Sequence, residues 1–124
     1  MSKKVYGSTM NLVNLTPHAI NFVWENPQGE YKTLLTIEPS GIIARVSAKT
    51  VMVDAIRLPS FSMPITATEF GEIEGLPAPE EGTVYIVSSL VAQRCKDRND
   101  VFIPNESVRD SQGRIIGCKS LGRI

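Results

Sequence analysis

The fold is decided by residues 84–95, which read Val-Tyr-Ile-Val-Ser-Ser-Leu-Val-Ala-Gln-Arg-Cys. Four β-branched or aromatic residues come first, which is typical of a buried strand. Ser88 and Ser89 follow, and either hydroxyl can accept a hydrogen bond from a free N–H in the first turn of a helix. The stretch therefore predicts a central strand that runs directly into the main helix, which ends near Lys96.

A helix that starts at a strand end also has a chemical implication. The partial positive charge of the helix N-terminus, together with two hydroxyls and free backbone N–H groups, suits an anion. Ser88 is therefore a candidate catalytic residue that could orient a nucleophile, and Ser89 is a candidate ligand-binding residue. The alternative is that the serines only cap a helix that follows a core strand. The sequence leaves both interpretations open.

Around this stretch, short β-rich runs alternate with turn residues. Residues 19–37 predict a β-hairpin, because apolar residues alternate on both sides of Asn26-Pro27-Gln28-Gly29. Residues 108–118 predict a second hairpin around Ser111-Gln112-Gly113. Further strands are expected over residues 11–15, 42–47, 51–58, 65–70 and 101–103, the last of them ended by Pro104, and loops over 59–64 and 71–82.

These elements define the predicted fold class. It is α+β and predominantly antiparallel β, as a sheet or a barrel-like arrangement, with one main helix after the central strand. A chain of 124 residues is enough for one domain, 1–124, and too short for two. Residues 1–10 are expected to be a loosely ordered lead-in.

Composition narrows the classes of function. The formal net charge is zero, which argues against binding to duplex nucleic acid. No apolar run reaches the roughly 20 residues of a membrane span, so no membrane partner is expected. The two cysteines fit neither a disulfide framework nor a metal site, so we expect a cytoplasmic protein. From Arg94 onward, seven cations and four acids leave a local charge of +3, which favours a small anionic ligand.

His18 is the only histidine of the chain. Its ordinary pKa allows an imidazole to give and take protons near neutral pH, so His18 is the first candidate for a catalytic residue. The neighbouring Thr16 offers a hydroxyl as a ligand-binding group, and Pro17 restricts the backbone between them. The alternative is a surface or hydrogen-bonded structural histidine.

Two arginine–aspartate sets are candidates for binding a phosphate. A guanidinium can grip a phosphate with two hydrogen bonds while a nearby carboxylate fixes its plane. The alternative is a pair of turn salt bridges, each contributing less than about 1 kcal/mol. The candidate ligand-binding residues of these sets are Arg98 with Asp100 and Arg109 with Asp110.

Known catalytic and cofactor motifs do not occur in the sequence. No Gly-x-Ser-x-Gly elbow surrounds Ser88, and neither a Walker loop nor a dinucleotide fingerprint is present. Glu69, Glu72 and Glu74 are better explained as a solvated acidic segment than as metal ligands. We therefore expect neither a metal nor a cofactor.

Three stretches together resemble a family of small proteins encoded by phages and other mobile elements. The most specific is Asn-Leu-Thr-Pro-His-Ala-Ile at residues 14–20. The others are Glu-Gly-Leu-Pro at 74–77 together with residues 82–93, and residues 108–118. This family is in turn similar to the small ring nucleases, which degrade the cyclic oligonucleotide signals of antiviral defence.

The second resemblance implies a metal-independent phosphodiesterase. A cyclic oligoadenylate carries its own nucleophile, the ribose 2′-hydroxyl, which would attack the adjacent phosphorus in line. His18 would protonate the departing 5′-oxygen as general acid. Arg98 or Arg109, with the N–H groups after Ser88, would stabilise the phosphoryl oxygens. Because the ligand has rotational symmetry, the resemblance also implies a homodimer with the site repeated about its two-fold axis.

The sequence also allows two other functions. The same residues could sequester a signalling nucleotide without cutting it. Alternatively, the chain is a phage accessory or interaction protein with no small-ligand site.

Overall fold

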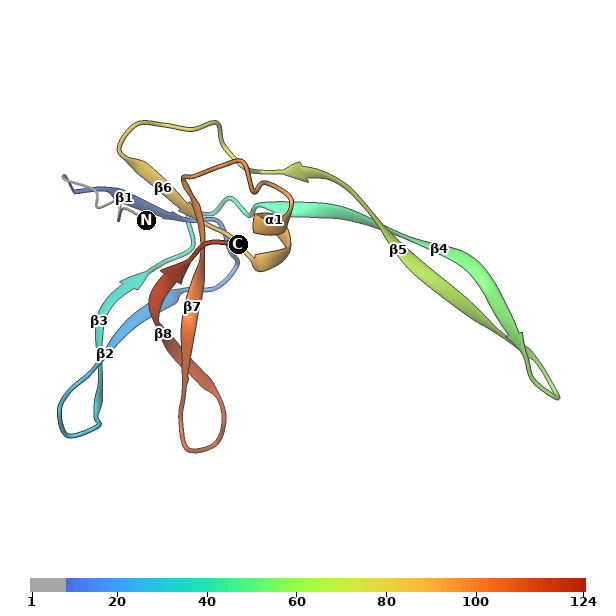
Figure 1. Ribbon diagram of the computed structural model, residues 1–124, viewed down its shortest axis with the longest axis horizontal. Helices are drawn as coiled ribbons and strands as arrows, with labels where there is room; N and C mark the ends of the chain where they lie inside the picture. Colours follow the sequence, from blue (N-terminus) through green and yellow to red (C-terminus); the bar gives the residue numbers. More distant parts are fainter. Residues whose placement is uncertain (1–8) are drawn as a thin grey trace, which may run out of the picture.

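The computed structural model describes residues 9–124, so the lead-in expected over residues 1–10 lies almost entirely outside the described residues. Within this range the elements follow one another as Figure 1 shows. They are β1 (Asn11–Asn14), β2 (Ile20–Glu25), β3 (Tyr31–Ile37), β4 (Arg45–Arg57), β5 (Ser62–Glu74), β6 (Thr83–Ile86), α1 (Ser89–Gln93), β7 (Val101–Arg109) and β8 (Ile115–Gly122).

Six strands form one curved sheet in the order β1-β6-β7-β8-β2-β3. Its two outer strands meet where Asn14, the last residue of β1, bridges Pro39 just after β3. The sheet is therefore nearly closed, which confirms the barrel-like form of the predicted fold (Figure 1). Both predicted hairpins are present, as β2–β3 and β7–β8.

The predicted antiparallel pairing is only partly confirmed. The hairpins β2–β3, β4–β5 and β7–β8 are antiparallel, but β6 pairs in parallel with β1 and with β7. β2 meets β8 at a single parallel pair, Phe22 with Cys118. Neighbouring runs joined by a tight turn pair antiparallel. The β1–β6 pairing joins Asn11 to Thr83, and such distant residues leave no local signal in the sequence.

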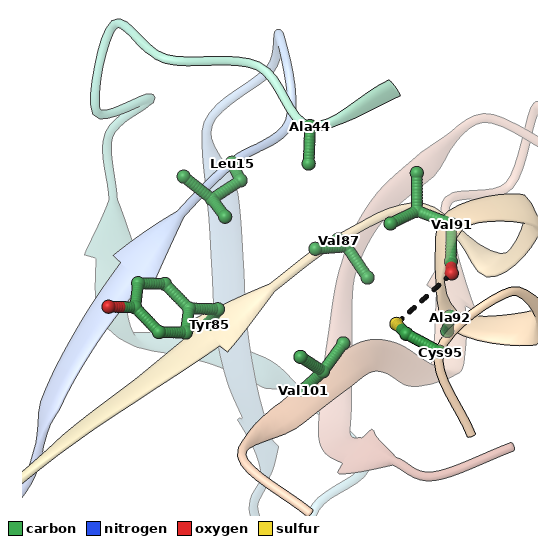
Figure 2. Close-up of a cluster of buried hydrophobic side chains, with 8 residues drawn as sticks. All are labelled: Leu15, Ala44, Tyr85, Val87, Val91, Ala92, Cys95 and Val101. Atoms are coloured by element: carbon green, nitrogen blue, oxygen red, sulfur yellow. Dashed lines mark hydrogen bonds between the residues drawn. The ribbon is translucent and has the colours of Figure 1, made fainter. Parts of the chain in front are cut away.

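The strand-to-helix stretch is buried as predicted, although β6 is second in the strand order and not at the centre of the sheet. All four residues of β6 are buried between β1 and β7. Val87 and Val91 then pack with Leu15 and Tyr85 in the main core cluster (Figure 2). The thiol of Cys95 belongs to this core and donates to the Val91 carbonyl at 3.2 Å.

The helix α1 is present but shorter than expected. Ser88 is its N-cap, and the Ser88 hydroxyl accepts a hydrogen bond from the N–H of Val91 at 3.5 Å. The N–H groups of Arg94 and Cys95 each bond to the carbonyl three residues earlier, which tightens the last turn and ends the helix after Gln93.

β4 and β5 leave the barrel as a long two-stranded ribbon, residues 45–74, called the arm below (Figure 1). At its end the N–H of Leu58 donates to the carbonyl of Phe61 at 2.8 Å, so residues 58–61 form the tip. The two strands expected over 42–47 and 51–58 are thus one strand, β4. The predictions of loops over 59–64 and 71–82 are wrong in part, because β5 includes Ser62–Pro64 and Gly71–Glu74.

Two prolines lie inside strands at positions where the sequence predicted a loop or a strand end. Pro64 lies in β5, and each strand of a two-stranded ribbon has a free edge that needs no donor. Pro104 lies in β7, which continues to Arg109 instead of stopping at Ile103. The parallel partner β6 reaches only as far as Phe102, so Pro104 also lies on an edge.

Candidate functional site

Residues 14–18 form a hydrogen-bonded turn at the end of β1. Asn14 is buried, and its Nδ2 donates to the carbonyls of His18 at 2.8 Å and of Ile37 at 3.0 Å. Its Oδ1 accepts from the N–H of Thr16 at 2.9 Å and from the Thr16 hydroxyl at 2.7 Å. One side chain therefore joins β1, the following turn and the end of β3, at the point where the barrel closes.

This turn fixes the backbone of His18 and leaves its ring in solvent. The His18 carbonyl lies within hydrogen-bond distance of Asn14 Nδ2 and of the Thr16 hydroxyl, at 2.8 and 3.0 Å. The residue is exposed, and its imidazole makes no hydrogen bond to any other residue in the range 9–124. A ligand can therefore reach the ring, but no described side chain orients it.

Ser88 lies at the same end of the barrel as His18. β1 and β6 are parallel neighbours, and the N–H just after β1 bonds to the last carbonyl of β6 at 2.9 Å. The turn with Thr16 and His18 follows β1, and Ser88 and Ser89 follow β6, so all four leave the sheet in the same direction. Both serines are exposed, and the Ser88 hydroxyl already serves as the cap of α1.

Arg98 and Asp100 bind each other. The Arg98 Nε and Nη2 donate to the two carboxylate oxygens of Asp100 at 2.8 and 2.9 Å, and Nη2 also donates to the Pro77 carbonyl at 3.0 Å. The side chains are only 19% and 14% exposed. The pair connects the loop before β6 to the loop before β7. The guanidinium edge formed by Nε and Nη2 of Arg98 is occupied by Asp100 and is not free for a phosphate.

The electrostatics of this pair follow from its hydrogen bonds. The hydrogen bond from Arg98 holds the pKa of Asp100 below its ordinary value, against the opposite effect of burial. The same hydrogen bond raises the pKa of Arg98. Burial raises the pKa of the nearby Cys95 thiol, so Cys95 is a core residue and not an activated nucleophile.

Arg109 and Asp110 lie at the other end of β7 and do not pair with each other. The Arg109 Nη1 donates to the Gly113 carbonyl at 2.7 Å. Asp110 accepts from the N–H groups of Gln112 and Arg114 and from the Arg114 guanidinium. These N–H donors lower the pKa of Asp110. Both residues stabilise the β7–β8 turn. Phe102 lies beside Val87, the residue before Ser88, and the turn is seven or more residues from Phe102, or roughly 20 Å along the strand.

The structure thus gathers some of the candidate residues and separates others. Thr16, His18, Ser88 and Ser89 share one end of the barrel. The two arginine–aspartate sets lie at opposite ends of β7 and are engaged in loop structure. Among residues 9–124, no group of three or more His, Cys, Asp and Glu side chains is placed to hold a metal ion. No helix in the same range has the length and apolar character needed to cross a membrane.

A separate, mostly apolar pocket of about 200 Å³ opens to solvent between the two hairpins of the barrel, and we call it the β2–β8 pocket. It is lined by Ala19, Ile20 and Asn21, by Pro104 and Ser107 of β7, and by residues 115–118 of β8. No charged side chain belongs to this lining. The pocket lies where β2 and β8 share only one residue pair, so the sheet itself does not fill the space.

Sequence reasoning missed Asn14 and the arm. For Asn14 the signal was the spacing Asn-x-Thr at a strand end, which is typical of a side chain that closes a turn on its own backbone. For the arm the signal was symmetry: β-rich runs of similar length flank Pro59-Ser60 on both sides.

Comparison with known proteins does not identify a family for this chain. No family model, no curated protein and no solved structure matches the chain. The resemblances to a phage-encoded family and to ring nucleases therefore stay predictions from the sequence.

Proposed function

We propose that this protein is a non-catalytic interaction protein that acts by binding another protein through the arm. The observation that supports this proposal is the apolar surface of β4 and β5. Five large apolar side chains of the arm's outer half, namely Met52, Val53, Ile56, Phe61 and Met63, are between 45% and 70% exposed. Only Val46 and Ile73, at the base of this ribbon, pack against the barrel core.

One face of the arm's outer half is mostly apolar. Side chains of directly paired residues in an antiparallel ribbon point to the same side, and so do every second residue along a strand. Ile56 pairs with Met63 and Val51 with Ala67, and Ile65 lies between Met63 and Ala67 on β5. These residues form one stripe in which the only charged side chain is that of Asp54, which pairs with Ile65.

Physical chemistry favours a partner for such a ribbon. An isolated two-stranded hairpin is at best marginally stable in water. Its two outer edges present unpaired N–H and C=O groups along 13 residues on each strand. Exposed apolar patches of this kind mark protein interaction sites. The barrel core reaches only the base of the arm, where Val46 and Ile73 pack against it.

Site-specific photo-crosslinking in cells that express the protein tests this function. A photoreactive amino acid at Ile56 is expected to give crosslinked protein products, because this side chain lies on the apolar stripe. The same amino acid at Leu34 of β3, which is 68% exposed, is the matched control and should give few. Equal labelling from both positions, or none from position 56, would contradict the proposal.

A second candidate function is metal-independent cleavage of a cyclic oligonucleotide. It is supported by the common end of the barrel at which Thr16, His18 and Ser88 emerge. His18 would act as general acid towards the departing 5′-oxygen. Because Arg98 and Arg109 are engaged elsewhere, charge stabilisation would have to come from backbone N–H groups or from a second subunit. Sequestration of the intact nucleotide is the non-catalytic form of this candidate.

Incubation of the purified protein with a panel of cyclic oligonucleotides in the presence of EDTA decides this candidate. If the protein is a nuclease, His18→Ala will lower the cleavage rate by at least about 100-fold, the usual contribution of a general acid. Recovery of uncut ligand from denatured protein would identify sequestration instead. Absence of both cleavage and binding removes the candidate. For both candidate functions we expect a cytoplasmic location, where the buried thiols of Cys95 and Cys118 stay reduced.

A further inference from the structure

The tip of the arm differs from ordinary hairpin ends. Turns of hairpins are usually polar, yet here the two-residue loop Pro59-Ser60 is flanked by Leu58 and Phe61, which are 36% and 54% exposed. Residues 58–65 contain no charged side chain. The aromatic ring of Phe61 is thus carried at the far end of the ribbon.

The arm places this tip beyond the reach of its own barrel. β4 and β5 each have 13 residues, or about 43 Å of extended chain, whereas the longest barrel strand, β7, has nine. Figure 1 shows the arm leading away from the barrel, on the side opposite the β2–β3 hairpin. The tip can therefore contact only another molecule.

The β2–β8 pocket has the size and chemistry that the tip requires. Its volume is about 200 Å³, and an apolar cavity of roughly 150 Å³ already accepts a benzene ring. Pro104, Ile115 and Ile116 supply apolar walls, and neither the pocket lining nor residues 58–65 carry a charge. Both surfaces are thus uncharged, and neither has to desolvate an ion when they meet. Asn21 and Ser107 are the polar side chains of the pocket lining.

Resting on the function proposed above, we infer that the partner of the arm is a second copy of this chain, whose β2–β8 pocket receives Phe61. The arm of one molecule then binds the barrel of the next, which is a head-to-tail contact. Such a contact continues until it closes into a ring or extends as a filament. This assembly differs from the two-fold homodimer expected from the sequence.

The apolar area on one face of the arm suits a contact at the small end of the range for protein interfaces. Five large apolar side chains on this face and its tip are 36% to 54% exposed, at positions 56, 58, 61, 63 and 65. At roughly 100 Å² each, about half the area of a large apolar side chain, they provide on the order of 500 Å². One side of a standard protein interface buries about 800 Å², and weaker contacts bury less. Between Thr50 and Thr66 the arm carries one acid and one base, Asp54 and Arg57, so like-charge repulsion does not oppose the contact.

The oligomeric state of the purified full-length protein, measured by sedimentation over a wide concentration range, tests this inference. We expect the unmodified protein to associate beyond the monomer. Phe61→Asp, which alters the tip, and Ile115→Asp, which alters the pocket, should each weaken association by about 30-fold or more, as for a central interface residue. Leu34→Asp, at another exposed apolar position, is the matched control and should associate normally.

Mixing the two variants gives the decisive result. Phe61→Asp retains an intact pocket and Ile115→Asp retains an intact tip, so an equimolar mixture should form a two-copy complex and stop there. Formation of this complex also shows that both variants are folded. A monomeric unmodified protein, or normal association of Ile115→Asp, would overturn the inference. Crosslinking from Ile56 to a different protein would still support the proposed function, so the two failures are distinguishable.

Discussion

Replacement of Asn14 by leucine will lower the free energy of unfolding by about 3 kcal/mol, the largest effect that we expect from a single polar residue of this protein. Asn14 is buried, and its carboxamide satisfies the Thr16 N–H and the carbonyls of His18 and Ile37. Leucine has a similar size but offers neither donor nor acceptor. The Thr16 N–H and the Ile37 carbonyl would then lose their partner in a partly buried place. The His18 carbonyl would keep only the Thr16 hydroxyl, at 3.0 Å.

Urea unfolding measures this effect as a shift of the midpoint at unchanged slope. Asn26→Ala is the matched control, because Asn26 also bonds to two backbone N–H groups, at 3.0 and 2.8 Å, but in an exposed turn. We expect the control to cost no more than about 1 kcal/mol, since water replaces the lost bonds. Similar losses for the two variants would mean that burial of Asn14 is not the cause.

The Asn14 result would also change the meaning of the most distinctive string in the sequence. Residues 14–20 suggested a catalytic histidine held by a threonine and a proline. In the structure the asparagine and the threonine of this string bond to each other and to the backbone, and only the imidazole is left free. A string that is specific in sequence can therefore specify a barrel closure rather than an active site.

Elements with a local cause could be predicted from the sequence. The hairpin over residues 19–37 has alternating apolar residues and a Pro-x-Gly turn, and the β6–α1 stretch has a serine cap at Ser88. The pairing of β1 with β6 could not be predicted, because nothing local distinguishes a parallel from an antiparallel neighbour. The exposure of the arm could not be predicted for a related reason. Residues 51–58 have the composition of a buried strand, and their exposure depends on what the rest of the chain leaves uncovered.

The candidate site shows the same division between local and distant contacts. Arg98 and Asp100, two residues apart around a turn, do form the predicted contact. Arg109 and Asp110 are adjacent, but Asp110 instead accepts the N–H groups of its own turn and pairs with Arg114. Whether either set faces His18 depended on the direction of β7 relative to β1 and β6, which is a property of the whole sheet.

The second large effect is expected at the Arg98–Asp100 pair. Arg98→Met will lower the free energy of unfolding by about 2 kcal/mol, because it leaves the Asp100 carboxylate and the Pro77 carbonyl without their donor in a mostly buried place. The pair is partly open to solvent, which keeps this figure below that of a fully buried pair. A second change, Asp100→Asn in the Arg98→Met background, should recover part of the loss, since the unpaired charge is removed.

The stabilisation by the Arg98–Asp100 pair depends on pH. Arg98 lowers the pKa of folded Asp100 below the unfolded value of about 3.9. The stabilisation by the pair is therefore complete above about pH 4 and is lost as the pH falls through the lower folded pKa. In the Arg98→Met variant this loss should shrink, leaving the acid sensitivity that Asp110 retains from its own N–H donors. Unfolding measured from about pH 6 down to about pH 3 checks this.

The same variant separates a structural arginine from a phosphate ligand. A guanidinium reserved for a phosphate would leave stability almost unchanged when replaced, and the acid loss would equal that of the unmodified protein. The observed hydrogen bonds require the opposite, because Nε and Nη2 of Arg98 are both used within the fold. An Arg98→Met variant that keeps full stability at pH 7 would therefore return Arg98 to the set of ligand-binding candidates and, with it, strengthen the nuclease function against the interaction function.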